Sequence, residues 1–312
     1  MTAFAEILRQ GFPDLTVQIH APLAPLTTFK VGGPADWLVE PHDGDTIVRL
    51  LKLAYGHGVP VTMLGGGSNV LVADAGVRGL VIRPRGGTMQ MVGNDLVRVD
   101  AAVTINALVR WTVARGLGGI EAWAGTPGTV GGAIHGNAHW HKANIGDVVE
   151  SVRIASRDGG LRQVDHDRMD FGYDTSRLQR SGEIAIWVAF RVTPGQPPDA
   201  LRAVARTSLA FRKRTQPLVS PSAGCIFQNP QPGRDRVPEG IPASAGALVD
   251  RAGLKGHVVG GARVSPTHGN FIVNDGSATA ADIAALIEMC RAQVHDAYGV
   301  DLREEVVRLG AW

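Results

Sequence analysis

Two residue types that anchor many small domains are scarce in this 312-residue sequence. Aromatic residues make up 5% of it, and its only cysteines are Cys225 and Cys290. Two cysteines exclude a disulfide framework and suit a reducing compartment. Charge is scarce as well, because charged residues make up 19% and nearly cancel to a formal net charge of +2. So small a charge argues against nucleic acid or a membrane surface as the partner.

Long apolar runs are also missing. No stretch approaches the roughly 20 apolar residues of a membrane-spanning helix. The first helical segment, Thr2–Arg9, lacks the basic start and apolar centre of a signal peptide. We therefore expect a cytoplasmic protein that acts on small molecules, with no nucleic-acid, membrane or obligate protein partner. The 44% of hydrophobic residues is enough to build two or three domains.

Glycine, in contrast, is abundant, and part of it is gathered in two turns. They are Leu64–Asn69, which reads LGGGSN, and Gly125–Gly132, which reads GTPGTVGG. Glycine permits positive φ and close approach, and successive N–H groups in such turns form a nest for an anion. The turns predict two clamps for one diphosphate; the alternative is that both are only tight connections. Their spacing matches neither the Gly-x-Gly-x-x-Gly dinucleotide fingerprint nor a phosphate loop, because no lysine follows either turn.

The hydrophobic pattern of the N-terminal third predicts a strand, a helix and a second strand. The strands are expected at 35–40 and 60–64, and the helix between them places apolar residues at helical spacing, namely Ile47, Leu50, Leu51 and Ala54. The first glycine turn follows the second strand, where open α/β units place ligands. Further strands are expected at residues 71–73, 80–82, 96–99, 152–154, 161–164 and 184–192, and helices at 104–115 and 199–214.

The C-terminal region predicts a capped helix. Thr279 and Asp282 are spaced as a capping box. The helix that they begin is expected to bury one stripe of residues, namely Ile283, Leu286, Ile287, Cys290 and Val294. Cys290 is therefore expected in a core.

Five motifs occur in the order and spacing of a known family. They are Leu26–Ala35 (LTTFKVGGPA), Leu64–Asn69, the run Gly125–Asn137, Pro221–Pro230 (PSAGCIFQNP) and Glu305–Gly310 (EVVRLG). In these motifs the chain resembles the UDP-N-acetylenolpyruvoylglucosamine reductase (UDP-N-acetylmuramate dehydrogenase) family of peptidoglycan synthesis, over nearly its whole length. No tyrosine-rich insertion is evident between Ile184 and Asp199, so it is similar to the shorter, loop-lacking subtype.

The resemblance implies an α+β fold with a two-lobed FAD-binding region of the vanillyl-alcohol-oxidase/PCMH type and a C-terminal α+β substrate-binding domain. The expected boundaries are 1–85 and 86–205 for the two FAD-binding lobes and 206–312 for the substrate-binding domain, whose last residues pack back near the flavin. It also implies non-covalent FAD and NADPH as co-substrate. The residues expected to bind FAD are Gly65, Gly66, Gly67, Ser68, Asn69, Gly125, Thr126, Pro127, Gly128, Thr129, Gly131, Gly132 and Asn137.

The implied reaction needs one acid and one group that stabilises charge. Reduction of an enolpyruvyl double bond builds charge on the adjacent carboxylate and requires a proton on the neighbouring carbon. Cys225 stands where the family presents a serine as proton donor, which implies that its thiol is the acid. The alternative is an inert core cysteine. Its place between Gly224 and the turn Phe227–Pro230, away from any helical stripe, favours catalysis.

Two further catalytic residues are implied by the resemblance. Glu305 matches the catalytic glutamate, which acts near the developing carboxylate charge; the alternative is a surface glutamate beside Glu304. The family's third catalytic residue is an arginine directly after a tyrosine, but here Asp174 follows Tyr173. An aspartate cannot donate a guanidinium fork to a carboxylate. Arg177 is therefore the candidate, and the alternative is a surface arginine in a turn.

Polar groups for the UDP-sugar are expected mainly in the C-terminal half. The expected residues are Tyr173, Arg212, Arg214 and Asn229, with Lys213 as an alternative to Arg214. A basic helix end suits a diphosphate. The competing interpretation is that this cluster of charges is an ordinary solvated helix face.

Three histidines lie within seven residues, at His135, His139 and His141. Such a group raises the question of a metal. We expect none, because no cysteine or second carboxylate lies at ligand spacing and the loop overlaps the expected FAD-binding run. His139, Trp140 and His141 depart from the family pattern, and the sequence gives them no chemical role.

Three classes of function stay open on the sequence alone. The expected one is an FAD-containing reductase that uses NADPH to convert UDP-N-acetylglucosamine enolpyruvate to UDP-N-acetylmuramate. The second is an FAD-dependent alcohol oxidase of the same superfamily, against which the C-terminal motif argues. The third is a non-catalytic UDP-sugar-binding relative, which Asp174 and Cys225 suggest.

Overall fold

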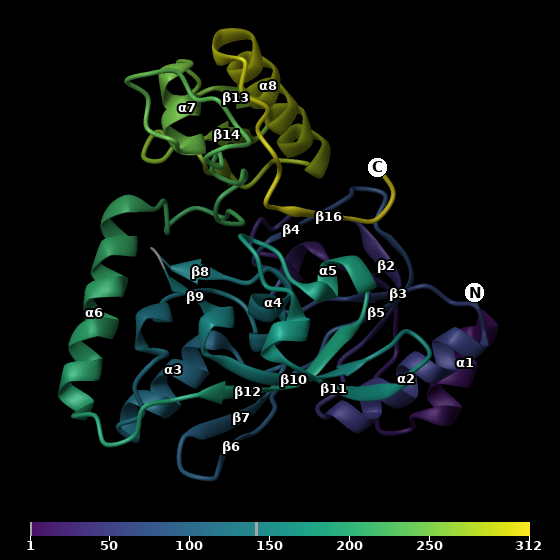
Figure 1. The fold of residues 1–312 in the computed structure, drawn as a ribbon. Helices are drawn as coiled ribbons and strands as arrows, with labels where there is room; N and C mark the ends of the chain where they lie inside the picture. The colour runs from purple at the N-terminus through teal and green to yellow at the C-terminus, as the bar shows by residue number, and fades with distance from the viewer. Residues whose placement is uncertain (1, 141–142) are drawn as a thin grey trace. The chain divides into compact units, whose positions relative to one another are not determined.

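The computed structural model describes residues 2–140 and 143–312, which divide into two compact units. The first unit contains the residues up to 21 together with 36–66 and 79–211, and the second contains 22–35, 67–78 and 212–312. Figure 1 labels most of their helices and strands. In the described part of the chain, no helix is long and apolar enough to cross a membrane. The expected division into 1–85, 86–205 and 206–312 stays a prediction.

The helices of the first unit follow the expected pattern of apolar residues. They are α1 (Thr2–Gly11), α2 (Gly44–Gly56), α3 (Ile105–Ala114), α4 (Val130–His135), α5 (Arg177–Ser181) and most of α6 (Pro198–Thr215). The Asp43 carboxylate accepts a hydrogen bond from the Thr46 N–H at 2.7 Å and so begins α2. The four apolar residues predicted for this helix are all buried.

A four-stranded sheet carries the strand, helix and strand that the sequence predicts. Its order is β1 (Gln18–Pro22), β2 (Pro34–Val39), β5 (Val77–Ile82) and β3 (Val61–Met63). β5 lies between the two predicted strands β2 and β3, and it pairs with β3 in parallel, with Val61 opposite Leu80. α1 and α2 share one hydrophobic core with this sheet. The first glycine turn leaves the carboxyl end of β3, as expected.

A five-stranded antiparallel sheet completes the first unit. Its order is β11 (Leu161–Asp165), β10 (Val149–Ala155), β12 (Ile184–Arg191), β7 (Leu96–Asp100) and β6 (Met89–Val92). Alternate residues such as Val97 and Val99 are fully buried against α3 and α4. A short hairpin of β8 (His139–Trp140) and β9 (Ala143–Asn144) follows α4.

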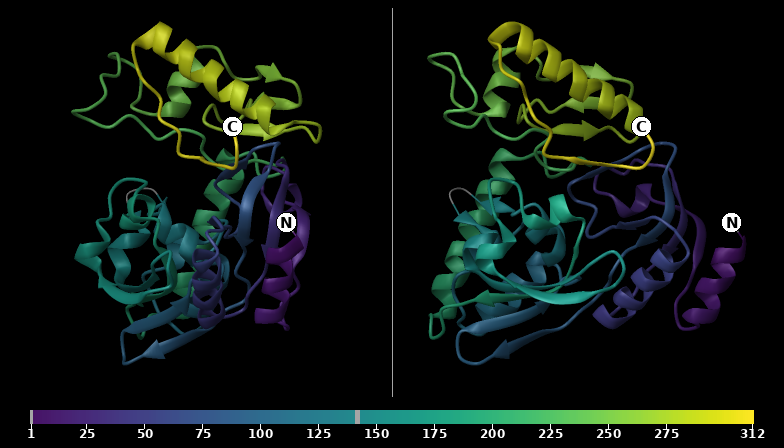
Figure 2. Two further views of the ribbon diagram at one scale, coloured as in Figure 1. Left: turned by 90° about the vertical axis from the view of Figure 1, so that its right-hand side faces the viewer. Right: turned by 45° about the vertical axis from the view of Figure 1, so that its right-hand side comes forward.

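The second unit is built around α8 (Ala280–Tyr298). Thr279 and Asp282 form the predicted capping box, and Cys290 is buried with the rest of the predicted stripe. The helix packs on β13 (Val258–Val259) and β14 (Ala262–Val264), which continue into β15 (Ile272–Asn274), as Figure 2 shows. The unit also contains α7 (Ala245–Arg251) and a parallel pair of β4 (Val70–Val72) and β16 (Val307–Leu309). This mixture of helices and largely antiparallel sheets confirms the α+β prediction.

Candidate functional site

The two glycine-rich turns meet in the first unit. A β-carbon built on Gly66 would lie 2.6 Å from the Cα of Gly128, and one on Gly65 would lie 2.7 Å from Oγ1 of Thr129. Real β-carbons do not approach other atoms so closely, and at Gly66 the opposing atom is backbone, so glycine is required there. The structure therefore brings together residues from both turns that the sequence assigned to one ligand.

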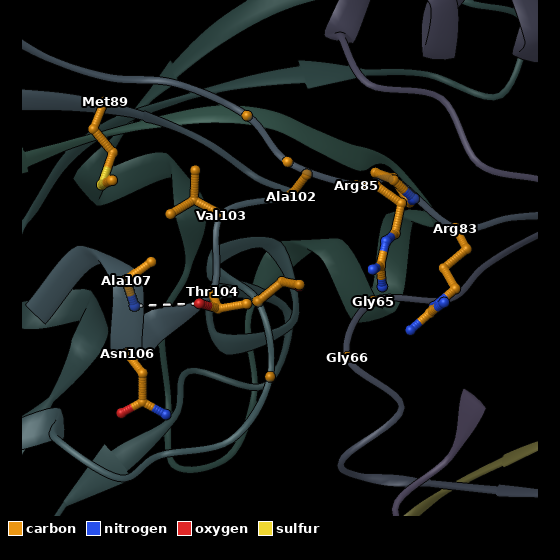
Figure 3. A pocket seen from close by; sticks show the side chains of 15 residues that line it. Gly65, Gly66, Arg83, Arg85, Met89, Ala102, Val103, Thr104, Asn106 and Ala107 are labelled. Atoms are coloured by element: carbon orange, nitrogen blue, oxygen red, sulfur yellow. Dashed lines mark hydrogen bonds between the residues drawn. The ribbon is translucent and has the colours of Figure 1, made fainter. Parts of the chain in front are cut away.

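These turns border a cavity of about 600 Å³. Figure 3 shows Gly65 and Gly66 with Arg83 and Arg85 on one side, and Thr104, Asn106 and Ala107 on the other. Gly86, Gly87, Ala102, Val103 and Met89 add a small and apolar lining. The volume of the cavity and its combination of polar and apolar lining residues suit the binding of one side of a dinucleotide.

Hydrogen bonds hold the second glycine turn against α3. The side chain of Asn106 accepts from the Gly125 N–H at 2.8 Å and donates to the Thr126 carbonyl at 3.3 Å. Thr129 caps α4 by accepting from the Gly132 N–H at 3.3 Å. These hydrogen bonds hold the turn in place, and successive N–H groups in such a turn can form a nest for an anion.

Two arginines that the sequence analysis missed line the cavity. Arg83 contacts Glu40 at 2.7 Å, while Arg85 lies 3.8 Å from the same carboxylate oxygen. Two arginines therefore share one carboxylate, which leaves a net positive charge on this wall of the cavity. Their signal was Arg-Pro-Arg-Gly-Gly at the carboxyl end of β5. Glycine backbone, threonine hydroxyls and arginines together fit a pyrophosphate.

Other residues expected to bind FAD have structural contacts of their own. Asn137 is 2% exposed, and its side chain donates to the Gly172 carbonyl at 2.7 Å and accepts from the Gly146 N–H at 2.9 Å. Gly67 belongs to the second unit, where its carbonyl accepts from the Thr28 N–H at 2.9 Å. The FAD-binding roles of Gly67, Ser68, Asn69, Gly131, Gly132 and Asn137 stay predictions, as do those of Gly65, Gly66, Gly125, Thr126, Pro127, Gly128 and Thr129.

Asp174, which stands at the expected arginine position, pairs with His139. Nδ1 of His139 lies 2.9 Å from Oδ1 of Asp174. The Asp174 side chain is 5% exposed and that of His139 is 28% exposed. The ring of Tyr173 lies 5.3 Å from the imidazole. His139, which had no role in the sequence analysis, is thus joined to the position where the chain departs from the motif of the family that it resembles.

Arg177, the sequence candidate for the missing cation, is bound to another carboxylate. Its Nε–H donates to Glu183 at 2.8 Å, and Arg162 contacts the second oxygen of the same group. Glu183 is buried, which opposes ionisation, but hydrogen bonds from Arg177, Ser181 and Arg162 outweigh burial and hold its pKa below the ordinary value. Arg177 therefore has a structural partner, and its catalytic role stays a prediction.

In the second unit, the segments that carry Cys225 and Glu305 are hydrogen-bonded neighbours. The Glu305 N–H donates to the Ile226 carbonyl at 2.8 Å, and the Gln228 N–H donates to the Arg303 carbonyl at 2.9 Å. Asn69 joins them, because its side chain donates to the Glu305 carbonyl at 3.0 Å. The fold thus brings together the two segments, and the roles of Cys225 and Glu305 in handling the proton and the carboxylate stay predictions.

Arg212 lies near Cys225 in the same unit. Burial lowers the pKa of Arg212 to about 10, and the charge of Cys225 opposes this shift. Arg212 is 8% exposed and remains a cation at neutral pH. The side-chain oxygen of Asn229 accepts a hydrogen bond from the N–H of Ala245, the first residue of α7, at 3.0 Å. The substrate-binding roles of Tyr173, Arg212, Arg214 and Asn229 stay predictions.

Metal binding finds no support in the part of the chain that the structure describes. No group of three His, Cys, Asp or Glu side chains there could hold an ion. His141, the third histidine of the predicted loop, lies outside the described residues. The expectation of no metal stays a prediction.

Comparison with known proteins assigns a class to the first unit. A family model described as "FAD binding domain" matches residues 35–165, which contain most of the cavity's walls and both glycine turns. Together with the nest and its arginines, this match defines an FAD-binding flavoprotein.

The family follows from matches over nearly the whole chain. Residues 216–309 match the model described as "UDP-N-acetylenolpyruvoylglucosamine reductase, C-terminal domain". Proteins of that name are 38% identical in Bacillus velezensis, over 93% of this chain and 92% of theirs, and 40% identical in Parasynechococcus marenigrum, over 95% and 97%. The crystal structure of the reductase from Thermus caldophilus is 32% identical with a TM-score of 0.77 and covers 95% of this chain and 98% of its own. The chain belongs to the UDP-N-acetylenolpyruvoylglucosamine reductase family, whose members are oxidoreductases of peptidoglycan synthesis.

Proposed function

We propose that this chain uses NADPH and non-covalent FAD to reduce UDP-N-acetylglucosamine enolpyruvate to UDP-N-acetylmuramate in the cytoplasm. Membership of the family supports both this reaction and the use of FAD. The pairing of the Cys225 and Glu305 segments is the observation that most supports this reaction. The reaction needs a proton donor and, close to it, a group that acts on the substrate carboxylate.

The reaction sets two demands on the chain's own residues. NADPH is oxidised to NADP⁺, the enolpyruvyl double bond gains a hydride equivalent at one carbon, and a proton must reach the neighbouring carbon. Bound FAD would supply the electron transfer between the two substrates. We assign the proton to Cys225, whose Sγ–H would donate it, and the control of charge at the substrate carboxylate to Glu305.

The cavity of the first unit would hold FAD. Gly65, Gly66 and Gly128 let the backbone approach the pyrophosphate, because any β-carbon at Gly66 would collide with the facing turn. Thr129 and the arginines at 83 and 85 would bind phosphate oxygens. The small, partly apolar lining leaves room for the rest of the dinucleotide.

Steady consumption of NADPH separates this function from its alternatives. The purified holoprotein should oxidise NADPH only after the enolpyruvyl nucleotide is added, one molecule for each molecule of product. An alcohol oxidase would instead consume dioxygen with an alcohol and without NADPH. Binding of the nucleotide with no NADPH consumption would indicate a non-catalytic relative and contradict the proposal.

A further inference from the structure

The His139–Asp174 pair has the geometry of an oriented hydrogen-bond donor. A carboxylate only accepts hydrogen bonds, so the Nδ1–H of His139 donates a hydrogen bond to Asp174. This bond fixes the rotation of the ring and leaves Nε2 for a second partner. In the protonated imidazole Nε2 is also a donor. A buried aspartate orienting a partly exposed histidine is a recurrent way to present one imidazole nitrogen to a substrate.

Asp174 is itself held firmly. It adopts the left-handed backbone conformation, with φ of 53°, and its carbonyl accepts from the side chain of Gln179 at 3.0 Å. Its second carboxylate oxygen, Oδ2, is buried and receives no hydrogen bond from residues 2–140 or 143–312. Among these residues, the carboxylate of Asp174 is therefore hydrogen-bonded to His139 through Oδ1 alone.

A second observation connects the pair with a residue that is predicted to bind the substrate. Tyr173, a residue predicted to bind substrate, lies with its ring 5.3 Å from the imidazole of His139. Arg177, the other nearby candidate for binding an anion, already donates its Nε–H to Glu183, which is 7% exposed. His139 retains a side chain that is 28% exposed and one ring nitrogen beyond its bond to Asp174.

We infer that His139, oriented by Asp174, binds the carboxylate of the enolpyruvyl group through Nε2–H and stabilises the charge that builds there during reduction. His139 touches the substrate, and Asp174 is a positioning residue. This inference rests on the proposed function and names the residue that replaces the arginine expected at position 174. When both ring nitrogens carry a proton, the Nε2–H of His139 would form a charge-assisted hydrogen bond with the substrate carboxylate.

Binding measurements test this assignment without turnover. The probes are UDP-N-acetylglucosamine enolpyruvate and UDP-N-acetylglucosamine, which lacks the carboxylate, each titrated into the FAD-loaded protein. His139→Gln should weaken binding of the first about 10- to 100-fold, as loss of one hydrogen bond to a charged group does. It should leave binding of the second unchanged. Equal loss for both nucleotides, or none for either, would overturn the inference.

The step after binding is measured separately. With FAD reduced chemically beforehand, mixing with the enolpyruvyl nucleotide should reoxidise it, and His139→Gln should slow this by about 100-fold. Asp174→Asn, which keeps the shape but not the charge, should reproduce both effects in weaker form. If the flavin of the wild-type protein is not reoxidised, the proposed function is wrong. If the flavins of wild type and His139→Gln are reoxidised equally fast, the inference is wrong but the proposed function stands.

A matched control is available in the second unit. His295 pairs with Asp301 at 2.9 Å, but both side chains are more than half exposed. His295→Gln should change neither nucleotide binding nor reoxidation. Unchanged flavin absorbance and melting temperature in each variant establish that it is folded and loaded. If His139→Gln does not fold, Asp174→Asn alone decides the outcome by its selectivity between the two nucleotides.

Discussion

Gly66 and Gly128 touch backbone to backbone, since a β-carbon on the first would lie 2.6 Å from the Cα of the second. The contact joins two turns that are some sixty residues apart in the sequence. It explains why neither turn matches a common nucleotide fingerprint. The predicted nest is made by two loops together, and the first loop needs glycine at position 66 to admit the second.

Gly66→Ala should therefore damage both the fold and FAD binding. The added methyl group must push backbone aside, which typically costs about 1–3 kcal/mol of unfolding free energy. Thermal denaturation of the apoprotein and titration with FAD measure the two effects. Gly56→Ala is the control, because nothing lies within 4 Å of its β-carbon position at the end of α2. That variant should be as stable as wild type or slightly more so.

Alkylation should distinguish the two cysteines. Burial raises the pKa of Cys290 to about 12, so its thiolate is negligible at pH 8 and it should resist iodoacetamide in the folded protein. Cys225, which is partly exposed, should be labelled, with loss of turnover. Peptide mass spectrometry locates the label. Full activity after complete labelling of Cys225 would remove it from the mechanism.

Substitution of Cys225 tests its role as an acid more directly. Cys225→Ser keeps a donor and should retain turnover, whereas Cys225→Ala should lower kcat by about 10²–10⁴-fold, the usual range for a lost general acid. Similar kcat values for the serine and alanine variants would exclude proton donation by this side chain.

Glu304 and Glu305 should behave differently although they are neighbours. Glu304 accepts two hydrogen bonds from Arg308, at 2.8 and 2.9 Å, and these bonds raise the pKa of Arg308. Because this pair is partly exposed, Glu304→Gln should cost at most about 1 kcal/mol of stability and leave kcat near wild type. Glu305→Gln should lower kcat by about 100-fold or more. The reverse order in steady-state kinetics would contradict the assignment.

The cluster around Glu183 should make stability depend on acid pH. Its pKa is lowered in the folded protein, so its contribution is fully present above the unfolded value of 4.5 and is lost as pH falls through the lower folded value. Melting temperatures from pH 7 to 3 should therefore drop less steeply in Glu183→Gln than in wild type. Arg177→Ala should lower the melting temperature at pH 7. A 100-fold loss of kcat in Arg177→Ala with unchanged stability would instead favour Arg177 as the carboxylate partner.

Local patterns predicted the parts of the fold that are determined locally. The apolar spacing of α2 and the capping box at Thr279 of α8 each depend on residues within a few turns of chain. The glycine turns were visible for the same reason. Their meeting at Gly66 and Gly128 could be expected only because both were assigned to one ligand.

Pairings between distant segments could not be predicted in this way. The side chain of Asn69 bonds to a residue 236 positions away, and the His139–Asp174 pair spans 35 positions. Such contacts depend on how elements pack, and no sequence period encodes them. Arg177 is close to position 174 along the chain, but in the folded protein His139 is the side chain bonded to Asp174.

Anaerobic reduction followed in one cuvette tests the central claim most directly. The protein loaded with FAD should be bleached near 450 nm by NADPH and regain its colour when UDP-N-acetylglucosamine enolpyruvate is added, with one UDP-N-acetylmuramate formed per flavin. A preparation that binds no FAD, or whose reduced flavin is untouched by the enolpyruvyl nucleotide, would contradict the account.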